Sequence, residues 1–157
     1  MQVWDVSTGK ELRTLNDYTM AVSSVAFSNN GIHIASGSKD KSVRVWDALT
    51  GRELRTLNGH TKVVSSIGFS SDSRHIVSGS EDKSVRVWVV STGVELRTLN
   101  GHTEVVSSVA LLSDGTCIVS GSWDQSVRVW GVGCFDRRCA KDPEQPHSGY
   151  FVRCVFK

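Results

Sequence analysis

At 157 residues the chain is long enough for one ordinary globular domain. Its 18 Lys and Arg residues nearly balance 16 Asp and Glu residues, so the charge gives no reason to expect nucleic acid or an anionic membrane as a partner. No apolar run approaches the length of a membrane span, and the start at Met1 lacks the regions of a signal peptide. We therefore expect a cytoplasmic protein.

The four cysteines are too few and too clustered to predict a disulfide framework. Cys134 and Cys139 are spaced loosely for a zinc site, and a second ligand pair is missing. We expect no metal and no cofactor.

Tryptophan recurs every 42 residues, at Trp4, Trp46, Trp88 and Trp130. The stretch 59–88 returns at 101–130 with most positions identical, and it also appears at 17–46 with an altered start. A period of this length is typical of repeat proteins, in which each unit buries its apolar faces against its neighbours.

In chain order, residues 1–16 are the trailing part of a unit, and complete units follow at 17–58 and 59–100. The unit 101–132 lacks the segment ELRTL that closes the others, and residues 133–157 abandon the pattern. Within the repeat, short β-branched or alternating runs predict strands, separated by Gly, Asn, Asp and Ser turns, at 53–57, 63–69, 76–78 and 85–88. Four strands in 42 residues leave no room for a helix, so the class is all-β.

The units 59–100 and 101–132 carry Gly-His at their start, and all three units carry Ser-Gly-Ser-x-Asp in their middle followed by Val-x-Val-Trp. This pattern resembles the WD (tryptophan–aspartate) repeats. The resemblance implies a β-propeller whose blades are four-stranded antiparallel sheets, with ELRTL as the outermost strand. The chain would form a partial, open propeller of about three blades, fewer than the roughly four that closure needs. The low divergence between units further resembles the near-identical WD arrays of fungal NOD-like receptor proteins.

Three polar residue types recur at fixed positions and are those of a Ser-His-Asp catalytic triad. An active site is normally built once, whereas this set occurs in successive units, and no Gly-x-Ser-x-Gly elbow is present. We therefore expect no enzyme but a buried hydrogen-bonded tetrad, in which Asp contacts His, His contacts Ser and Ser contacts Trp. The tetrad residues are His60, Ser78, Asp82 and Trp88; His102, Ser120, Asp124 and Trp130; and the incomplete set Ser36, Asp40 and Trp46.

The first complete unit has Asp17-Tyr18 where the others have Gly-His. We expect the Tyr18 hydroxyl to reach Asp40 at most, because the longer ring should not fit where the imidazole sits.

Positions that vary between otherwise similar units are expected to be exposed and to contact partners. Before the tetrad Asp they are Lys39, Glu81 and Trp123, and before the innermost strand they are Met20, Lys62 and Glu104. In WD proteins these two loops share one face. Trp123 is the strongest candidate anchor, since aromatic residues dominate interface energies. The alternative is that Trp123 packs against a neighbouring blade and binds nothing.

The tail 133–157 is either a divergent cap or an out-of-frame repeat. One choice of codons for residues 135–157, read from the next nucleotide, gives STGVAQRTLNSHTQVISSVAFS, which matches most of the stretch 91–112. This match favours the out-of-frame interpretation.

We expect a non-enzymatic protein–protein interaction scaffold that binds proteins or peptides through its loop face. The alternative is a non-functional or partial fragment of a larger fungal-type nucleotide-binding sensor whose WD array recognises a ligand. Self-association through uncovered blade faces is a further expectation, with 11–15 offered as a strand to the last blade.

Overall fold

The computed structural model describes residues 1–16, 18–112 and 117–131, and its regular secondary structure is entirely β. The strands are β1 Gln2–Trp4, β2 Glu11–Thr14, β3 Val22–Phe27, β4 His33–Ser38, β5 Val43–Asp47, β6 Glu53–Leu57, β7 Val64–Phe69, β8 His75–Ser80, β9 Ser84–Val89, β10 Glu95–Asn100, β11 Val106–Leu111, β12 Cys117–Ser122 and β13 Val127–Gly131. Within the described ranges, no helix is long and apolar enough to span a membrane.

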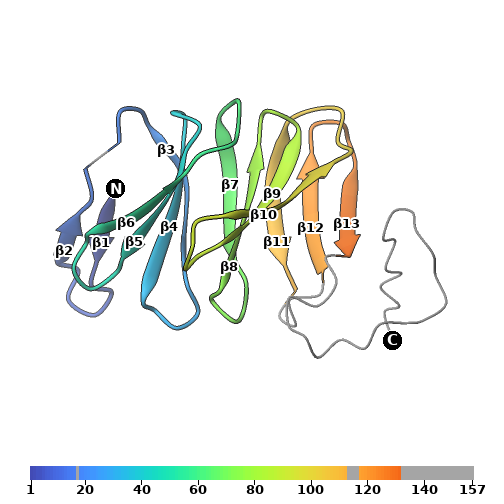
Figure 1. The fold of residues 1–157 in the computed structure, drawn as a ribbon. Coiled ribbons are helices and arrows are strands. Elements are labelled where there is room, and N and C mark those ends of the chain that lie inside the picture. The colour runs from blue at the N-terminus through green and yellow to red at the C-terminus, as the bar shows by residue number, and fades with distance from the viewer. Residues whose placement is uncertain (17, 113–116, 132–157) are drawn as a thin grey trace.

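The strands form four antiparallel sheets, which stand in a row from β1–β2 at one end to β11–β13 at the other (Figure 1). Two sheets have four strands each, in the orders β3-β4-β5-β6 and β7-β8-β9-β10. The first sheet has two strands, and the last has three among the described residues. The row does not close into a ring. The prediction of an all-β, partial, open β-propeller is confirmed.

The predicted strands and the position of ELRTL are also confirmed. Glu53–Leu57 and Glu95–Asn100 each pair along the outer edge of their sheet, against β5 and β9. Gly51 and Gly93, in the turns before these strands, have φ angles of 72° and 75°. Glycine adopts this left-handed conformation without steric cost, so the Thr-Gly pair suits a tight turn.

The hydrophobic core lies between successive sheets rather than inside any one of them. One cluster joins Val43 and Val45 of the first four-stranded sheet to Val64 and Ile67 of the next. A second repeats the arrangement one unit later, with Val85 and Val87 against Val106 and Val109. Each sheet is therefore stabilised mainly by the sheets on either side of it, as expected for a repeat protein.

Two glycines set how closely the sheets approach. A Cβ atom added to Gly37 in β4 would lie 2.6 Å from Val64 Cγ1, and one added to Gly79 in β8 would lie 2.7 Å from Val106 Cγ1. Only hydrogen fits in that space. The equivalent Gly121 in β12 has no atom within 4 Å of the same position.

The four sheets are built from strands within 2–14, 22–57, 64–100 and 106–131, and the unit bounds expected from the sequence stay a prediction. The expectations for the tail 133–157, for Cys134 and Cys139 and for Asp17 fall outside the described residues.

We predict that Gly79→Ala lowers the free energy of unfolding by about 1–3 kcal/mol, because the added methyl group overpacks the contact with Val106. Gly121→Ala is the matched control and should leave the stability of the isolated chain unchanged. Chemical denaturation measures both variants. Equal losses for the two would show that the close approach of the sheets is not the cause.

Candidate functional site

The second four-stranded sheet contains a complete chain of polar contacts, from its loops into its core. His60, in the loop before β7, places Nδ1 2.8 Å from Asp82 Oδ2 and Nε2 2.8 Å from Ser78 Oγ. Trp88 in β9 donates its indole N–H to the same Ser78 oxygen at 2.8 Å. A neutral imidazole with its proton on Nδ1 satisfies every group in this chain. The network therefore ties a loop to the two central strands of its sheet.

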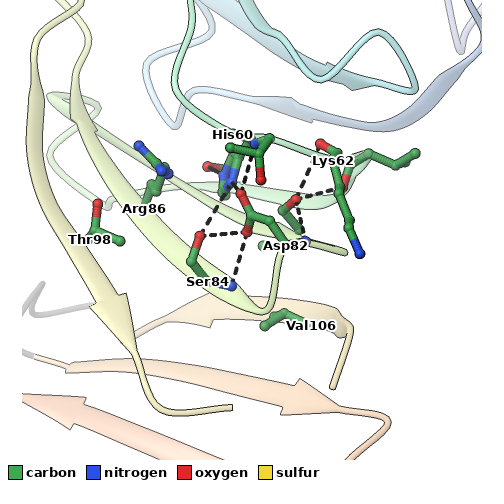
Figure 2. Close-up of polar contacts among 12 residues, drawn as sticks. His60, Lys62, Asp82, Ser84, Arg86, Thr98 and Val106 are labelled. Atoms are coloured by element: carbon green, nitrogen blue, oxygen red, sulfur yellow. Dashed lines mark hydrogen bonds and ion pairs between the residues drawn. The ribbon is translucent and has the colours of Figure 1, made fainter. Parts of the chain in front are cut away.

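Asp82 is held as a carboxylate by several donors. Its Oδ1 accepts from the backbone N–H of Ser84 at 3.0 Å and from the Ser84 hydroxyl at 2.6 Å, and its Oδ2 accepts from the backbone N–H of Thr61 at 3.0 Å. Figure 2 shows Asp82 between His60 and Ser84. Burial acts to raise the pKa of Asp82, but the hydrogen bonds from His60, Ser84 and Thr61 outweigh it and hold the pKa well below its usual range.

The arrangement is unsuited to acyl transfer although it contains Ser, His and Asp. Ser78 is fully buried between β7 and β9, where its oxygen already accepts the Trp88 indole proton. A nucleophile must be able to reach its substrate, and the Ser78 hydroxyl cannot. What the network does is satisfy polar atoms inside the sheet, which would otherwise be costly to bury.

The same network recurs one unit later. His102 contacts Asp124 at 2.8 Å and Ser120 at 2.7 Å, and Trp130 donates to Ser120 at 2.7 Å. The hydrogen bond from Ser126 is the main cause that lowers the pKa of Asp124, and the bond from His102 adds to it.

The expectation for Tyr18 is wrong. Its hydroxyl bonds to the Ser36 side chain and to the Ser36 carbonyl at 3.1 Å, not to Asp40. Its ring lies 5.8 Å from the Trp46 ring, close to the 6.1 Å between His60 and Trp88. The phenol therefore takes the place of the imidazole, because its length lets the hydroxyl stand where Nε2 would be.

The Tyr18 hydroxyl does not hydrogen-bond to Asp40, and Arg44 contacts the Asp40 carboxylate instead. Arg44 lies over the Tyr18 ring, 4.6 Å from its centroid, and its Nη2 is 3.5 Å from Asp40 Oδ2. Burial acts to raise the pKa of Asp40, but hydrogen bonds from Ser42 and Ser38 and the charge of Arg44 together lower it.

The sequence analysis missed two sets of polar residues. Arg44 pairs with Glu53 at 2.9 Å, and Arg86 pairs with Glu95 in the next sheet, joining the outermost strand to its neighbour. Ser23 and Ser65 donate across the gap between sheets to the carbonyls of Val64 and Val106. Both sets recur every 42 residues, and that recurrence was the signal that could have revealed them.

The candidate partner-binding residues come together in pairs at one end of the sheets. The backbone N–H groups of Lys39, Glu81 and Trp123 bond to the carbonyls of Ala21, Val63 and Val105 at 2.9–3.0 Å. Each accepting residue directly follows Met20, Lys62 or Glu104. Five of these six residues are exposed, and Glu81 is half-buried.

Trp123 has 69% of its surface exposed. Trp123 lies in the last described sheet, so its role as a partner-binding anchor stays a prediction. No group of three or more His, Cys, Asp or Glu side chains suited to a metal ion occurs among the described residues.

Successive four-stranded sheets with a buried His–Asp–Ser–Trp network define a β-propeller repeat protein. The chain belongs to the WD domain, G-beta repeat family, whose model matches residues 9–47, 51–89 and 93–131. Each matched segment begins in the turn before the outermost strand of one sheet and ends in the third strand of the next.

Similar solved structures include "Structure of U3-55K", with a TM-score of 0.74 and 28% identity, and "Crystal structure of RRP9 WD40 repeats", with a TM-score of 0.74 and 29% identity. Each comparison covers 76% of this chain but 38% of the other, so the chain spans well under half the length of these structures. A search of the curated proteins found no match.

We predict that His60→Ala and His102→Ala each lower the free energy of unfolding by about 1–3 kcal/mol, because each leaves the proton of a buried serine hydroxyl without its imidazole acceptor and removes one donor from the carboxylate. Thermal unfolding measures the effect. Tyr18→Phe is the matched change in the first unit and should also destabilise, through loss of the bond to Ser36. Wild-type stability in both His variants would refute the structural role of the network.

Acid should destabilise the fold through the tetrad carboxylates. The pKa values of Asp82 and Asp124 are lowered from the ordinary 3.8, so the unfolded chain binds their protons first as pH falls. Their contribution is fully present above that value and is lost below it. Melting temperature should therefore drop steeply on acidification below pH 3.8, and less steeply in Asp82→Asn/Asp124→Asn. An equal drop in that variant would contradict the assignment.

Proposed function

We propose that the chain is a non-enzymatic scaffold that binds other proteins or peptides through the loop face defined by Met20, Lys39, Lys62, Glu81, Glu104 and Trp123. WD-repeat domains generally bind other proteins, and the tetrad serines Ser36, Ser78 and Ser120 are fully buried, so a substrate cannot reach them. The backbone groups of the strands are hydrogen-bonded within the sheets, so we expect the loops to contact the partner.

The exposed Trp123 side chain is the observation that carries this proposal. The equivalent positions hold Lys39 and Glu81, so nothing in the repeat requires an indole at this position. Exposing a large aromatic side chain to water is unfavourable, and a partner that buries the Trp123 ring would gain that free energy on binding. Met20, which is also exposed, offers a second apolar contact in the first unit.

Charged groups around these anchors would give the partner its orientation. Lys83 Nζ donates to the Thr103 carbonyl at 2.6 Å and lies 3.4 Å from Glu104 Oε1, which links the loops of two neighbouring units. This contact holds Glu104 in the loop before β11, next to the β12–β13 turn that carries Trp123. A partner that combines an apolar side chain with basic groups fits this part of the face.

A second proposal is that the chain is part of a larger fungal-type nucleotide-binding receptor, with the WD array as its ligand-recognition segment. The near-identity of the units favours it, because it leaves variation mainly in the loop face. A full-length transcript tests it, since an upstream P-loop segment would identify the receptor. A transcript that encodes the WD array without such a segment would reject it.

We predict that Trp123→Lys abolishes the binding of any partner that contacts this face. Lysine is the residue of the first unit at this position, so the fold should be kept. The wild-type chain and the variant are compared by quantitative pull-down, followed by a titration of each purified partner. A loss of at least about tenfold in affinity is expected for a hot-spot residue.

The control is Val94→Arg, at an exposed position in the turn between β9 and β10, at the opposite end of the sheet. Arg52 holds the equivalent position in the preceding unit, so this change is also native to the repeat. Partners whose binding is kept in Trp123→Lys but lost in Val94→Arg would show that the binding face lies at the end of the sheet that carries Val94.

A further inference from the structure

The last sheet presents to solvent a face that is buried in the other units. Val127 is 72% exposed, whereas the equivalent Val43 and Val85 are fully buried. Gly121, which pairs with Val127, keeps the space that valine side chains fill at Gly37 and Gly79. Among the described residues, this face therefore keeps the space of an inter-sheet contact with no valine side chain in it.

The complementary face is exposed on β3. Val25 is 55% exposed, whereas its equivalents Ile67 and Val109 are 7% and 8% exposed because they pack against the preceding sheet. Among the described residues the first sheet consists of β1 and β2, which leave Val25 of β3 exposed. The two ends of the row therefore carry the two halves of one contact.

The internal contacts show which hydrogen bonds these halves would form. Ser65 donates to the Val106 carbonyl, and the backbone N–H of Val109 donates to Ser66 Oγ at 3.1 Å. The equivalents at the open ends are Ser107 with the Val22 carbonyl and Ser108 with the Val25 N–H. At the open ends the Ser107 hydroxyl is thus the equivalent donor and the Val22 carbonyl its acceptor, while the Val25 N–H is the donor and Ser108 Oγ its acceptor.

The strand edges are complementary in charge. Arg44 and Arg86 each pair with a glutamate of the outermost strand, but Arg128 in β13 has no carboxylate partner among the described residues. At the other end of the row, Glu11 in β2 accepts a hydrogen bond at 3.2 Å from Gln2, which stands where the other units have arginine. Arg128 lacks a glutamate, and Glu11 lacks an arginine.

We propose that the β11–β13 sheet of one copy of this chain binds β2 and β3 of a second copy, so that β2 becomes the fourth strand of that sheet. Val22 and Val25 of the second copy fill the space over Gly121, and Glu11 pairs with Arg128. The register repeats that of β5 on β6, with Val127 opposite Leu15 and Val129 opposite Arg13. Two copies that exchange these contacts at both ends form a closed ring of six sheets.

This contact displaces β1. Gln2–Trp4 occupy in front of β3–β6 the place that β13 of the second copy takes, because both align with Arg44–Trp46. β1 pairs with β2 through three residues, and Met1 and Val3 pack against the cluster of Leu15, Ile34 and Trp46, so the second copy must replace these contacts. β13 instead carries the Trp130 bond to Ser120 and is the better partner for β2.

Gly121→Ala tests the face. Sedimentation equilibrium of the wild-type 157-residue chain at micromolar concentration should show a dimer. The variant should raise the dissociation constant by about tenfold or more, since the methyl group occupies the space meant for Val22. Its melting temperature under dilute, monomeric conditions should stay unchanged. A monomeric wild type, or association that Gly121→Ala leaves unaltered, would overturn the proposal.

A charge exchange tests the edge. Arg128→Glu should weaken association, and combining it with Glu11→Arg should restore it, because the pair is re-formed with its charges reversed. Circular dichroism and the melting temperature under dilute, monomeric conditions report whether both variants remain folded. Loss of association in the single variant without recovery in the double variant would contradict the pairing of β13 with β2.

Discussion

The close contact between successive sheets is the constraint on which the rest of the fold depends. Gly37 and Gly79 leave room for the valine side chains of the next sheet and for no more. Around them the apolar clusters join residues of two sheets, so neither sheet buries its face alone. A unit of this kind gains most of its stability from its neighbours, which explains why the repeat spacing is kept without insertion.

The polar networks have a different role within this frame. His60, Ser78, Asp82 and Trp88 lie within one unit and hold a loop against its own sheet. They fix the end of the sheet at which the variable residues occur, so the loop face has a rigid support. Tyr18 shows that the network tolerates a change of chemistry when the replacement still reaches the buried serine and an arginine covers the carboxylate.

Much of the fold could be predicted because the repeat displays the same strand and turn signals several times. Periodicity also distinguished a structural His–Ser–Asp set from a catalytic one. The place of Tyr18 was mispredicted, since ring size alone does not show where a hydroxyl ends in three dimensions. The contacts of Ser23 and Ser65 and the role of Gly79 were missed because they depend on the distance between sheets, which no local pattern encodes.

Hydrogen exchange on the dilute, monomeric chain tests most directly whether each sheet is stabilised by its neighbours. β8 and β12 carry nearly the same sequence and the same pairing, but among the described residues only β8 lies in a sheet that has another sheet on each side. The amides of β8 should therefore exchange far more slowly than those of β12, and those of β1 fastest of all. Equal protection of β8 and β12 would show that each sheet is stable by itself and would contradict this account.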